Sequence, residues 1–466
     1  MEAAAATAGA RKRGTFFGEP MGLAYLSFTE AWERFSYYGM TALLPLYLSQ
    51  QLFQPGRIEN IVGFGPFRSV VEAIHGKLDT PAALQSQIQG DYSSLMYLTP
   101  LLGGIIADRF LSRRIAVAVG ALMMTGGHLA MAFDQSFLLA FLLLVVGCGL
   151  LKGNISTQVG QLYTPENGEG RTRGYSIYSI GINVGAVAGP LGCGFLAATF
   201  GYHWGFGLAG VLMLFGLITY LAGYRLLGEQ THELKPGSVA AEKATAQPGS
   251  WKPIAALIAV MAITIFHSIG YYQNTNQALI WIDQHVDRSL FGWEIPVEWF
   301  NSIDPFVSII IVPFLIGFWK WQKSHGGEPN EMGKICTGAA LAVLANLVLV
   351  PATLMPGKVS VLFPLVYNIL HGIAFIYYWP TLLGLVAGAA PTKLKSTLMG
   401  VAFISLSISY SVIGTIGRYY ETMSPTNFWL LHAGICACGV VLALVFGKPL
   451  MKVLRSAEAK QEGAAA

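Results

Sequence analysis

The chain has 466 residues, of which 53% are hydrophobic and 12% are charged, and its mean hydropathy is +0.52. A soluble domain carries about 25% charged residues, so this composition excludes an ordinary soluble protein and indicates one that crosses a membrane repeatedly. The formal net charge of +4 does not indicate nucleic-acid binding, because the basic residues are spread over short loops between apolar segments.

The first half of the chain predicts six membrane spans. Residues 1–20 form a tail that contains a basic cluster at 11–13, and the first span follows at 21–48. A polar insert rich in Pro and Gly occupies 51–89, with a short surface helix expected at Ser69–His75. Five further spans are expected near 91–108, 115–132, 137–163, 173–199 and 204–227.

The second half repeats this organisation. Residues 229–250 are polar, contain two prolines and predict a flexible linker, which is too short and polar for an extra helix pair. Six more spans are expected near 252–284, 297–321, 333–354, 359–388, 396–419 and 427–447, before a tail at 449–466. We therefore predict an all-α membrane protein with two six-helix bundles, at 21–228 and 251–448.

The basic residues predict the orientation. If the insert 51–89 is outside the cytoplasm, the outer side holds only Arg57, Arg68, Lys77, Arg288, Lys358 and Arg418 among the 29 Lys and Arg residues. The positive-inside rule then places both termini, and the linker, in the cytoplasm. We expect the plasma (inner) membrane. The five cysteines lie in or beside apolar segments without metal-type spacing, so we expect buried thiols and no metal site.

Charged residues interrupt the first span. Glu30, Glu33, Arg34, Tyr37 and Tyr38 fall at i, i+3, i+4, i+7 and i+8, so they share one face of a helix. A charged side chain at the centre of a membrane helix costs roughly 2.5–3.5 kcal/mol on insertion scales, which makes these residues candidates for an ion or substrate path.

Several motifs resemble one known family. EAWERFSYYG (30–39), YLTPLLGGIIADRFLSRR (97–114), LLKGNISTQVGQLY (150–163) and YSIGINVGAVAGPLG (178–192) occur in this order. Segments 287–305 and 399–407 add weaker matches. Together they resemble the proton-dependent oligopeptide transporter family, which has the major facilitator fold of twelve spans. The resemblance implies a cavity at the membrane midplane, between two bundles that rock against each other.

A second charged centre is Lys152, which follows an apolar run in the fourth span. Glu30, Glu33, Arg34 and Lys152 sum to zero charge, which suggests one buried network whose carboxylates take up the coupled proton and release a cation for the substrate. The alternative is a static salt bridge that only holds two helices together.

The resemblance also implies the pocket. The substrate-binding residues it indicates are Arg34, Tyr37, Tyr38, Thr41, Tyr92, Lys152, Asn183, Tyr272, Gln273, Asn301, Asp304 and Phe375. Four positions depart from the family pattern: Thr41 stands where an arginine is frequent, Tyr272 and Phe375 stand where acids are expected, and Ala402 stands where a tryptophan is expected.

Asp304 could compensate for the missing acids, because it precedes Pro305 where the family usually has Asn-Pro. We expect it to serve as an amine anchor or as an additional proton-coupling residue. The alternative is that Asp304 only caps a helix that begins at Pro305.

The leading interpretation is a proton-coupled symporter of di- and tripeptides or peptide-like solutes. The alternative is a transporter of the same fold that carries a different or narrower solute, for example an anionic one, or that works without proton coupling. The motifs of common enzyme sites are absent, so we expect no catalysis and no cofactor other than the coupling proton. The expected partners are the substrate, protons and the lipid bilayer, and we expect a monomer.

Overall fold

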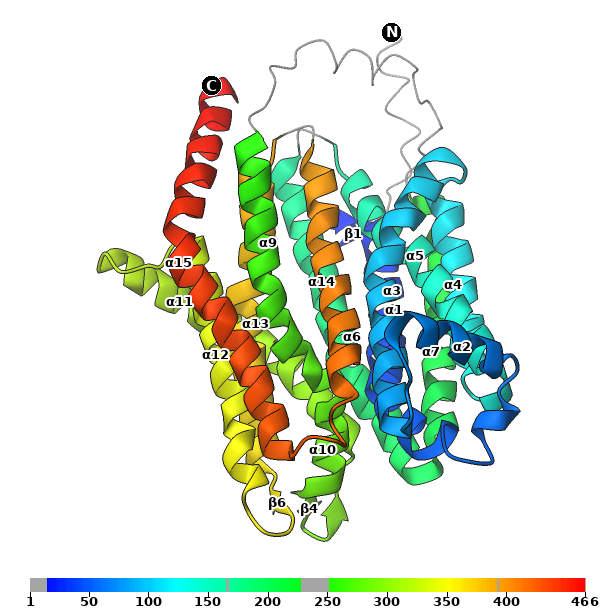
Figure 1. Ribbon diagram of the computed structural model, residues 1–466. Coiled ribbons are helices and arrows are strands. Elements are labelled where there is room, and N and C mark those ends of the chain that lie inside the picture. The colour runs from blue at the N-terminus through cyan, green and yellow to red at the C-terminus, as the bar shows by residue number, and fades with distance from the viewer. Residues whose placement is uncertain (1–14, 165–166, 228–250, 392–393, 466) are drawn as a thin grey trace.

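The computed structural model describes residues 15–164, 167–227, 251–391 and 394–465 (Figure 1). The predicted linker 229–250 and most of the predicted tail 1–20 lie outside these residues. The described chain is a bundle of long helices with three small two-stranded sheets at its ends.

The helices of the first half are α1 (Met21–Tyr47), α2 (Phe64–His75), α3 (Pro81–Arg109), α4 (Arg113–Ala130), α5 (Phe137–Gln161), α6 (Gly168–Phe200) and α7 (Tyr202–Gly223). Those of the second half are α9 (Trp251–Tyr271), α10 (Gln277–His285), α11 (Ile303–Ser324), α12 (Glu331–Thr353), α13 (Leu362–Ala389), α14 (Lys395–Gly417) and α15 (Pro425–Ala465). Short helical turns are η1 (Leu48–Leu52), η2 (Ile58–Asn60), η3 (Asp134–Ser136), η4 (Tyr224–Leu226), η5 (Tyr272–Thr275) and η6 (Val297–Ser302).

Two strands precede the first span, and the other four lie at one end of the second half. β1 (Thr15–Phe16) pairs antiparallel with β2 (Glu19–Pro20), and β4 (Ser289–Leu290) pairs antiparallel with β5 (Trp293–Glu294). β3 (Val286–Asp287) pairs parallel with β6 (Val359–Ser360). We call the end of the molecule that carries β4 and β6 the hairpin end; it is opposite the end of α15 (Figure 1).

Nine of the described helices are long and apolar enough to cross a membrane. They are α5, α6, α7, α9, α11, α12, α13, α14 and α15. The other three expected spans, α1, α3 and α4, belong to the same bundle but carry more polar residues: α1 buries Glu30, Glu33 and Arg34, and α4 begins with two arginines. The chain is therefore a multi-pass membrane protein.

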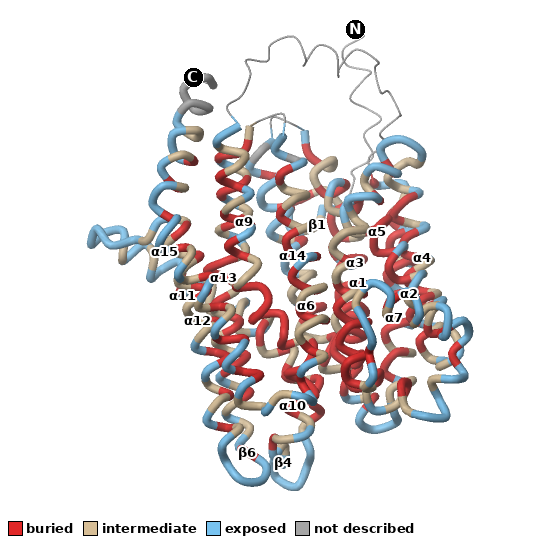
Figure 2. The backbone as a smooth tube through the Cα atoms, viewed as in Figure 1, coloured by how far each residue is buried: buried red, intermediate tan, exposed pale blue. Residues whose placement is uncertain are grey.

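The helices form two halves that meet along a few elements. In the first half α1 packs against α6 and α7, and α4 packs against α5; in the second half α12 packs against α13 and α15. Across the halves, α3 packs against α14 and α6 packs against η6. Buried residues run along the inside of both halves, as Figure 2 shows.

Glycines allow the closest of these contacts within the first half. Gly181, Gly185 and Gly189 follow one face of α6, and a Cβ on Gly181 would lie only 2.7 Å from the Ser27 carbonyl oxygen of α1. Small residues at this spacing let membrane helices approach closely. The helix that carries the charged stripe is thus held tightly against α6.

Several predicted boundaries were wrong. The helix expected from residue 91 begins at Pro81, where Thr80 caps it by accepting a hydrogen bond from the Ala83 amide, so the insert ends before residue 81. The expected seventh span 252–284 is broken into α9 and α10 by η5. The predicted C-terminal tail from residue 449 is helical, because α15 continues to Ala465, and its cytoplasmic location stays a prediction. The expected surface helix at 69–75 is confirmed as α2, which begins earlier, at Phe64.

Candidate functional site

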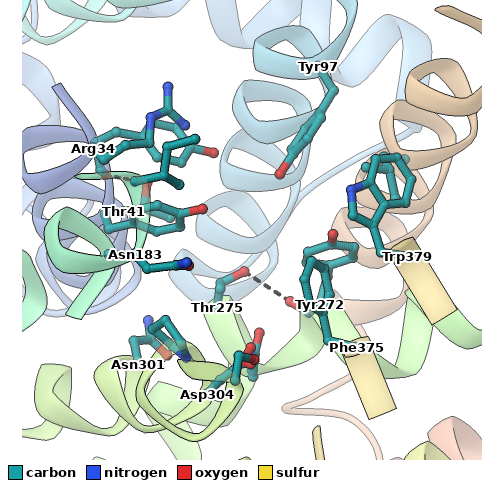
Figure 3. Close-up of a pocket in the computed structure, with 18 of the residues that line it drawn as sticks. Arg34, Thr41, Tyr97, Asn183, Tyr272, Thr275, Asn301, Asp304, Phe375 and Trp379 are labelled. Carbon is teal, nitrogen blue, oxygen red and sulfur yellow. Dashed lines mark hydrogen bonds between the residues drawn. The ribbon is translucent and has the colours of Figure 1, made fainter. Parts of the chain in front are cut away.

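A cavity of about 340 Å³ lies between the two halves. The first half contributes side chains from α1, α3, α5 and α6, and the second half contributes side chains from α9, η5, η6, α11, α13 and α14. Figure 3 shows these side chains converging from opposite sides on one space. The cavity combines four charged side chains with a wall of aromatic rings.

Arg34 is the centre of the charge cluster on α1. Its Nε lies 3.2 Å from Glu30 Oε1, one helical turn earlier, and its Nη2 donates to Glu33 Oε1 at 2.6 Å. All three residues are buried, and Glu33 is fully so. One guanidinium therefore serves two carboxylates, and Glu30 Oε2 has no hydrogen-bond partner among the described residues. A cluster with one surplus acid is suited to binding a proton.

Lys152 stands apart from this cluster. Its Nζ lies 4.5 Å from the ring centre of Tyr97 and 5.8 Å from that of Tyr37. No described carboxylate is within ion-pair distance of it. The predicted four-residue network is therefore incomplete: Glu30, Glu33 and Arg34 are ion-paired, whereas the lysine rests on aromatic faces, which attract a cation through the ring quadrupole.

Asp304 faces the cavity from the first turn of α11. Its carboxylate accepts a hydrogen bond from the Tyr271 hydroxyl. The alternative, that Asp304 caps a helix beginning at Pro305, is wrong, because α11 begins at Ile303 and its N-cap residue is Ser302. Asp304 is therefore a buried acid held toward the cavity by its neighbours.

Two amides extend the acidic side of the cavity. Asn274 in η5 and Asn301 in η6 line the cavity with Asp304, and the Oδ1 atom of each has no hydrogen-bond partner among the described residues. Buried polar atoms in proteins are normally paired. Two free carbonyl oxygens beside a carboxylate form a set of acceptors that matches the N–H donors of an ammonium group.

Aromatic rings form the remaining wall. Tyr97 stacks on Tyr410 with ring centres 5.4 Å apart, and Tyr410 contacts Tyr272 at 4.5 Å. Trp379 packs on Phe403 at 5.4 Å. Tyr97 is part of a motif segment (97–114), so its position could have been noticed in the sequence. Tyr410 and Trp379 have no charge or spacing signal that separates them from the other aromatic residues.

Most of the predicted site residues line this cavity: Glu30, Arg34, Tyr37, Tyr38, Thr41, Lys152, Asn183, Tyr272, Asn301, Asp304 and Phe375. Three do not. Glu33 pairs with Arg34 outside the lining, and the Tyr92 hydroxyl lies 3.9 Å from the Met40 sulfur. Gln273 is fully buried, and neither its Oε1 nor its Nε2 has a described partner.

The departures from the family pattern lie in this lining. Thr41, Tyr272 and Phe375 all line the cavity, so an uncharged group occupies each of these three positions. Ala402 is fully buried in the second half. Among the described residues, the charged lining is limited to Glu30, Arg34, Lys152 and Asp304.

Comparison with known proteins agrees with this architecture. Residues 34–414 match the sequence profile of the Major Facilitator Superfamily. The chain belongs to this superfamily of membrane transporters.

Individual transporters are also similar to this chain. An uncharacterized transporter, YclF of Bacillus subtilis (strain 168), is 29% identical, covering 89% of this chain and 91% of YclF. The peptide transporter YePEPT of Yersinia enterocolitica is 25% identical, and the match covers 96% of this chain and 98% of YePEPT. A crystal structure of a peptide transporter POT in complex with sulfate matches with a TM-score of 0.78 and 25% identity, covering 96% of this chain and 97% of that one. Within the superfamily, the chain is similar to peptide transporters, which agrees with the resemblance of its motifs to the proton-dependent oligopeptide transporter family.

Proposed function

We propose that the protein carries di- and tripeptides, or solutes built like them, across the membrane together with protons. The observation that carries this proposal is the polarity of the central cavity, which places Lys152 on the first half and Asp304 on the second. The similarity to the peptide transporter YePEPT supports the same cargo class. The leading interpretation from the sequence is retained.

The cavity suits a molecule with an amine at one end and a carboxylate at the other. Asp304, with the free oxygens of Asn274 and Asn301, offers acceptors for a peptide ammonium group. Lys152 has no described carboxylate partner and offers a cation for the peptide carboxylate. The tyrosine hydroxyls are available for backbone groups, whose chemistry does not depend on the peptide sequence.

The charge cluster on α1 supplies the coupling in this proposal. When Glu30 or Glu33 accepts a proton, the carboxylate becomes a neutral carboxylic acid and attracts Arg34 less strongly. Arg34 lines the cavity, so its freed donors can then bind an anionic group of the substrate. Loss of the proton restores the ion pair and weakens substrate binding. The static salt bridge remains the alternative role for this cluster.

The cargo is tested by uptake into proteoliposomes. A dipeptide, its N-acetyl derivative, its C-terminal amide and a small anionic solute without an amine are compared at equal concentration. The proposal predicts that the free dipeptide is taken up best and that either blocking group lowers its uptake. Equal uptake of the dipeptide and both blocked derivatives would contradict it.

The alternative, a different or narrower solute, is favoured by Thr41, Tyr272 and Phe375, because these uncharged residues leave the cavity with fewer anchors than the family pattern implies. Preferred uptake of the anionic solute in the same panel would select this alternative. We propose a monomer in the plasma membrane, with both termini in the cytoplasm.

A further inference from the structure

A second cavity, of about 380 Å³, lies between the halves at the hairpin end. The first half contributes the end of α1, the end of α6 and the start of α7; the second half contributes α10, the β4–β5 hairpin and η6. Its lining includes four charged residues, Asp283, Arg288, Glu294 and Glu298. None of these four residues lines the central cavity, so the proposed transport function gives them no role.

Glu298 differs from the other acids of this cavity. Arg288 pairs with Asp283 at 2.8 Å and with Glu294 at 2.9 Å, and Asp283 also accepts from Gln50 at 2.7 Å. The residue Glu298 is only 4% exposed, and no described cation lies within ion-pair distance of its carboxylate. Glu298 is thus a buried acid with no ion pair among the described residues, whereas Asp283 and Glu294 share the Arg288 guanidinium.

Glu298 lies in the seal between the halves. The neighbouring Trp299 donates from Nε1 to the Leu191 carbonyl of α6 at 3.0 Å, and Ser302 donates to the Val187 carbonyl at 2.7 Å. A Cβ on Gly194 would lie 2.8 Å from Glu298 Cβ, so η6 packs directly against the backbone of α6 here. This contact between η6 and α6 leaves Glu298 almost without exposure to water.

The central cavity adjoins another cavity toward its opposite end. A third cavity, of about 460 Å³, lies between α3, α5 and α14 toward the far end of the bundle. It shares Tyr97 and Phe403 with the central cavity. The three cavities follow the boundary between the halves, and η6 with α6 separates the central one from the one at the hairpin end.

We propose that Glu298 is a protonation site whose neutral form allows the seal at the hairpin end to close. A charged carboxylate loses much of its hydration when it is buried, whereas a carboxylic acid loses far less. The other titratable or charged groups around it are Arg288 just before β4, Glu294 in β5, Asp283 on α10, Tyr202 on α7 and Cys193 on α6. Arg288 is already engaged by two acids, so it does not replace the proton.

The proposal fixes how the seal responds to pH. Because the closed seal binds a proton at Glu298 more tightly than the open, hydrated seal does, low pH favours closure and high pH favours opening at the hairpin end. A proton taken up from the medium at this end would therefore close the seal behind a substrate. Only this last step rests on the proposed function; closure itself does not require transport.

The test measures the distance across the seal in purified protein. The native cysteines Cys336 and Cys438 are first replaced by serine. Spin labels are then attached to the cysteines introduced by Phe200→Cys, at the end of α6, and Ser289→Cys, on the hairpin. Both label positions are exposed. We expect two populations of label-to-label distance, a short one in sealed molecules and a long one in open molecules. As the pH is raised through the titration of Glu298, the ratio of open to sealed molecules should rise by up to about tenfold per pH unit.

Three variants make the test specific. Glu298→Gln should remain sealed at every pH, whereas Glu298→Asp, which keeps a titratable carboxyl, should retain a pH-dependent ratio. Glu421→Gln is the control, because it removes an exposed acid from the loop between α14 and α15 that makes no ion pair among the described residues, and it should behave as the parent protein does. A pH-independent ratio in the parent, or an unchanged pH dependence in Glu298→Gln, would overturn the proposal. Neither result depends on whether the protein transports peptides, so failure of the proposed function is detected separately.

Discussion

In the proposed function Lys152 binds the substrate carboxylate, because no carboxylate among the described residues pairs with its ammonium group. Its ammonium lies over the rings of Tyr97 and Tyr37. A hydrogen bond to a charged group contributes about 1.5–3 kcal/mol, which corresponds to roughly a 10- to 150-fold change in affinity. Lys152→Ala should therefore weaken dipeptide binding by about this factor, as measured by isothermal titration calorimetry.

The control for Lys152 uses both the ligand and the chain. A dipeptide amide has no carboxylate, so its affinity should change little in Lys152→Ala. Lys358→Ala removes an exposed lysine from the loop before β6 and should leave both affinities unchanged. An equal loss of affinity for the dipeptide and for its amide would show that Lys152 does not bind the carboxylate.

Asp304 permits the complementary prediction at the amine end. Asp304→Asn keeps the size of the side chain but removes its charge, so the free dipeptide should bind about 10-fold or more weakly. The N-acetyl dipeptide, which has no ammonium group, should bind as weakly to the parent protein as to the variant. Asp287→Asn, at an exposed position on β3, is the control. Unchanged affinity for the free dipeptide would exclude the amine anchor.

At the scale of elements, the position of the charge cluster depends on the contact between α1 and α6. Gly181 is one of the positions at which α6 meets the backbone of α1. Gly181→Val should force the helices apart and destabilise the protein by about 1–3 kcal/mol, which appears as a lower thermal unfolding midpoint in detergent.

Gly207 provides a matched glycine for this prediction. It lies in α7, and a Cβ added there meets nothing within 4 Å. Gly207→Val should therefore lower the unfolding midpoint much less than Gly181→Val. Equal effects of the two substitutions would mean that helix propensity, and not the α1–α6 contact, controls the stability.

Element boundaries also show where the sequence is informative. Most helices follow apolar runs, whose length and hydropathy are local properties. The start of α3 could not be found in this way, because Gln85 and Gln89 are polar yet fully buried or nearly so. They are paired across the molecule, for example by Gln85 Nε2 with Asn276 Oδ1 at 2.8 Å. Such a partner 191 residues away leaves no local signal.

The same distinction applies to the site. The stripe Glu30, Glu33 and Arg34 follows from helical periodicity alone, and the structure brings the three together as ion pairs. Whether Lys152 joins them depends on the distance between α1 and α5, which periodicity does not determine. Gln273 was misplaced because η5 interrupts the expected helix and turns this side chain into the protein interior.

At the scale of the whole molecule, η6 and α6 separate the central cavity from the cavity at the hairpin end. Toward the opposite end, the central cavity shares Tyr97 and Phe403 with the third cavity. Alternating access requires these separations to exchange. A substrate that bridges Lys152 on the first half and Asp304 on the second would then hold the halves together during the exchange. Proton binding at Glu30 or Glu33 would decide when the substrate is bound and released.

The most direct test of this account is a flux measurement in proteoliposomes with an imposed pH gradient and an internal pH indicator. The account predicts that the dipeptide accumulates against its own gradient and that its addition increases proton influx. Glu33→Gln, with a neutral side chain in place of a proton-binding acid, should lose accumulation while the protein remains folded. Downhill dipeptide movement with no change in proton flux, or full accumulation by folded Glu33→Gln, would contradict the account.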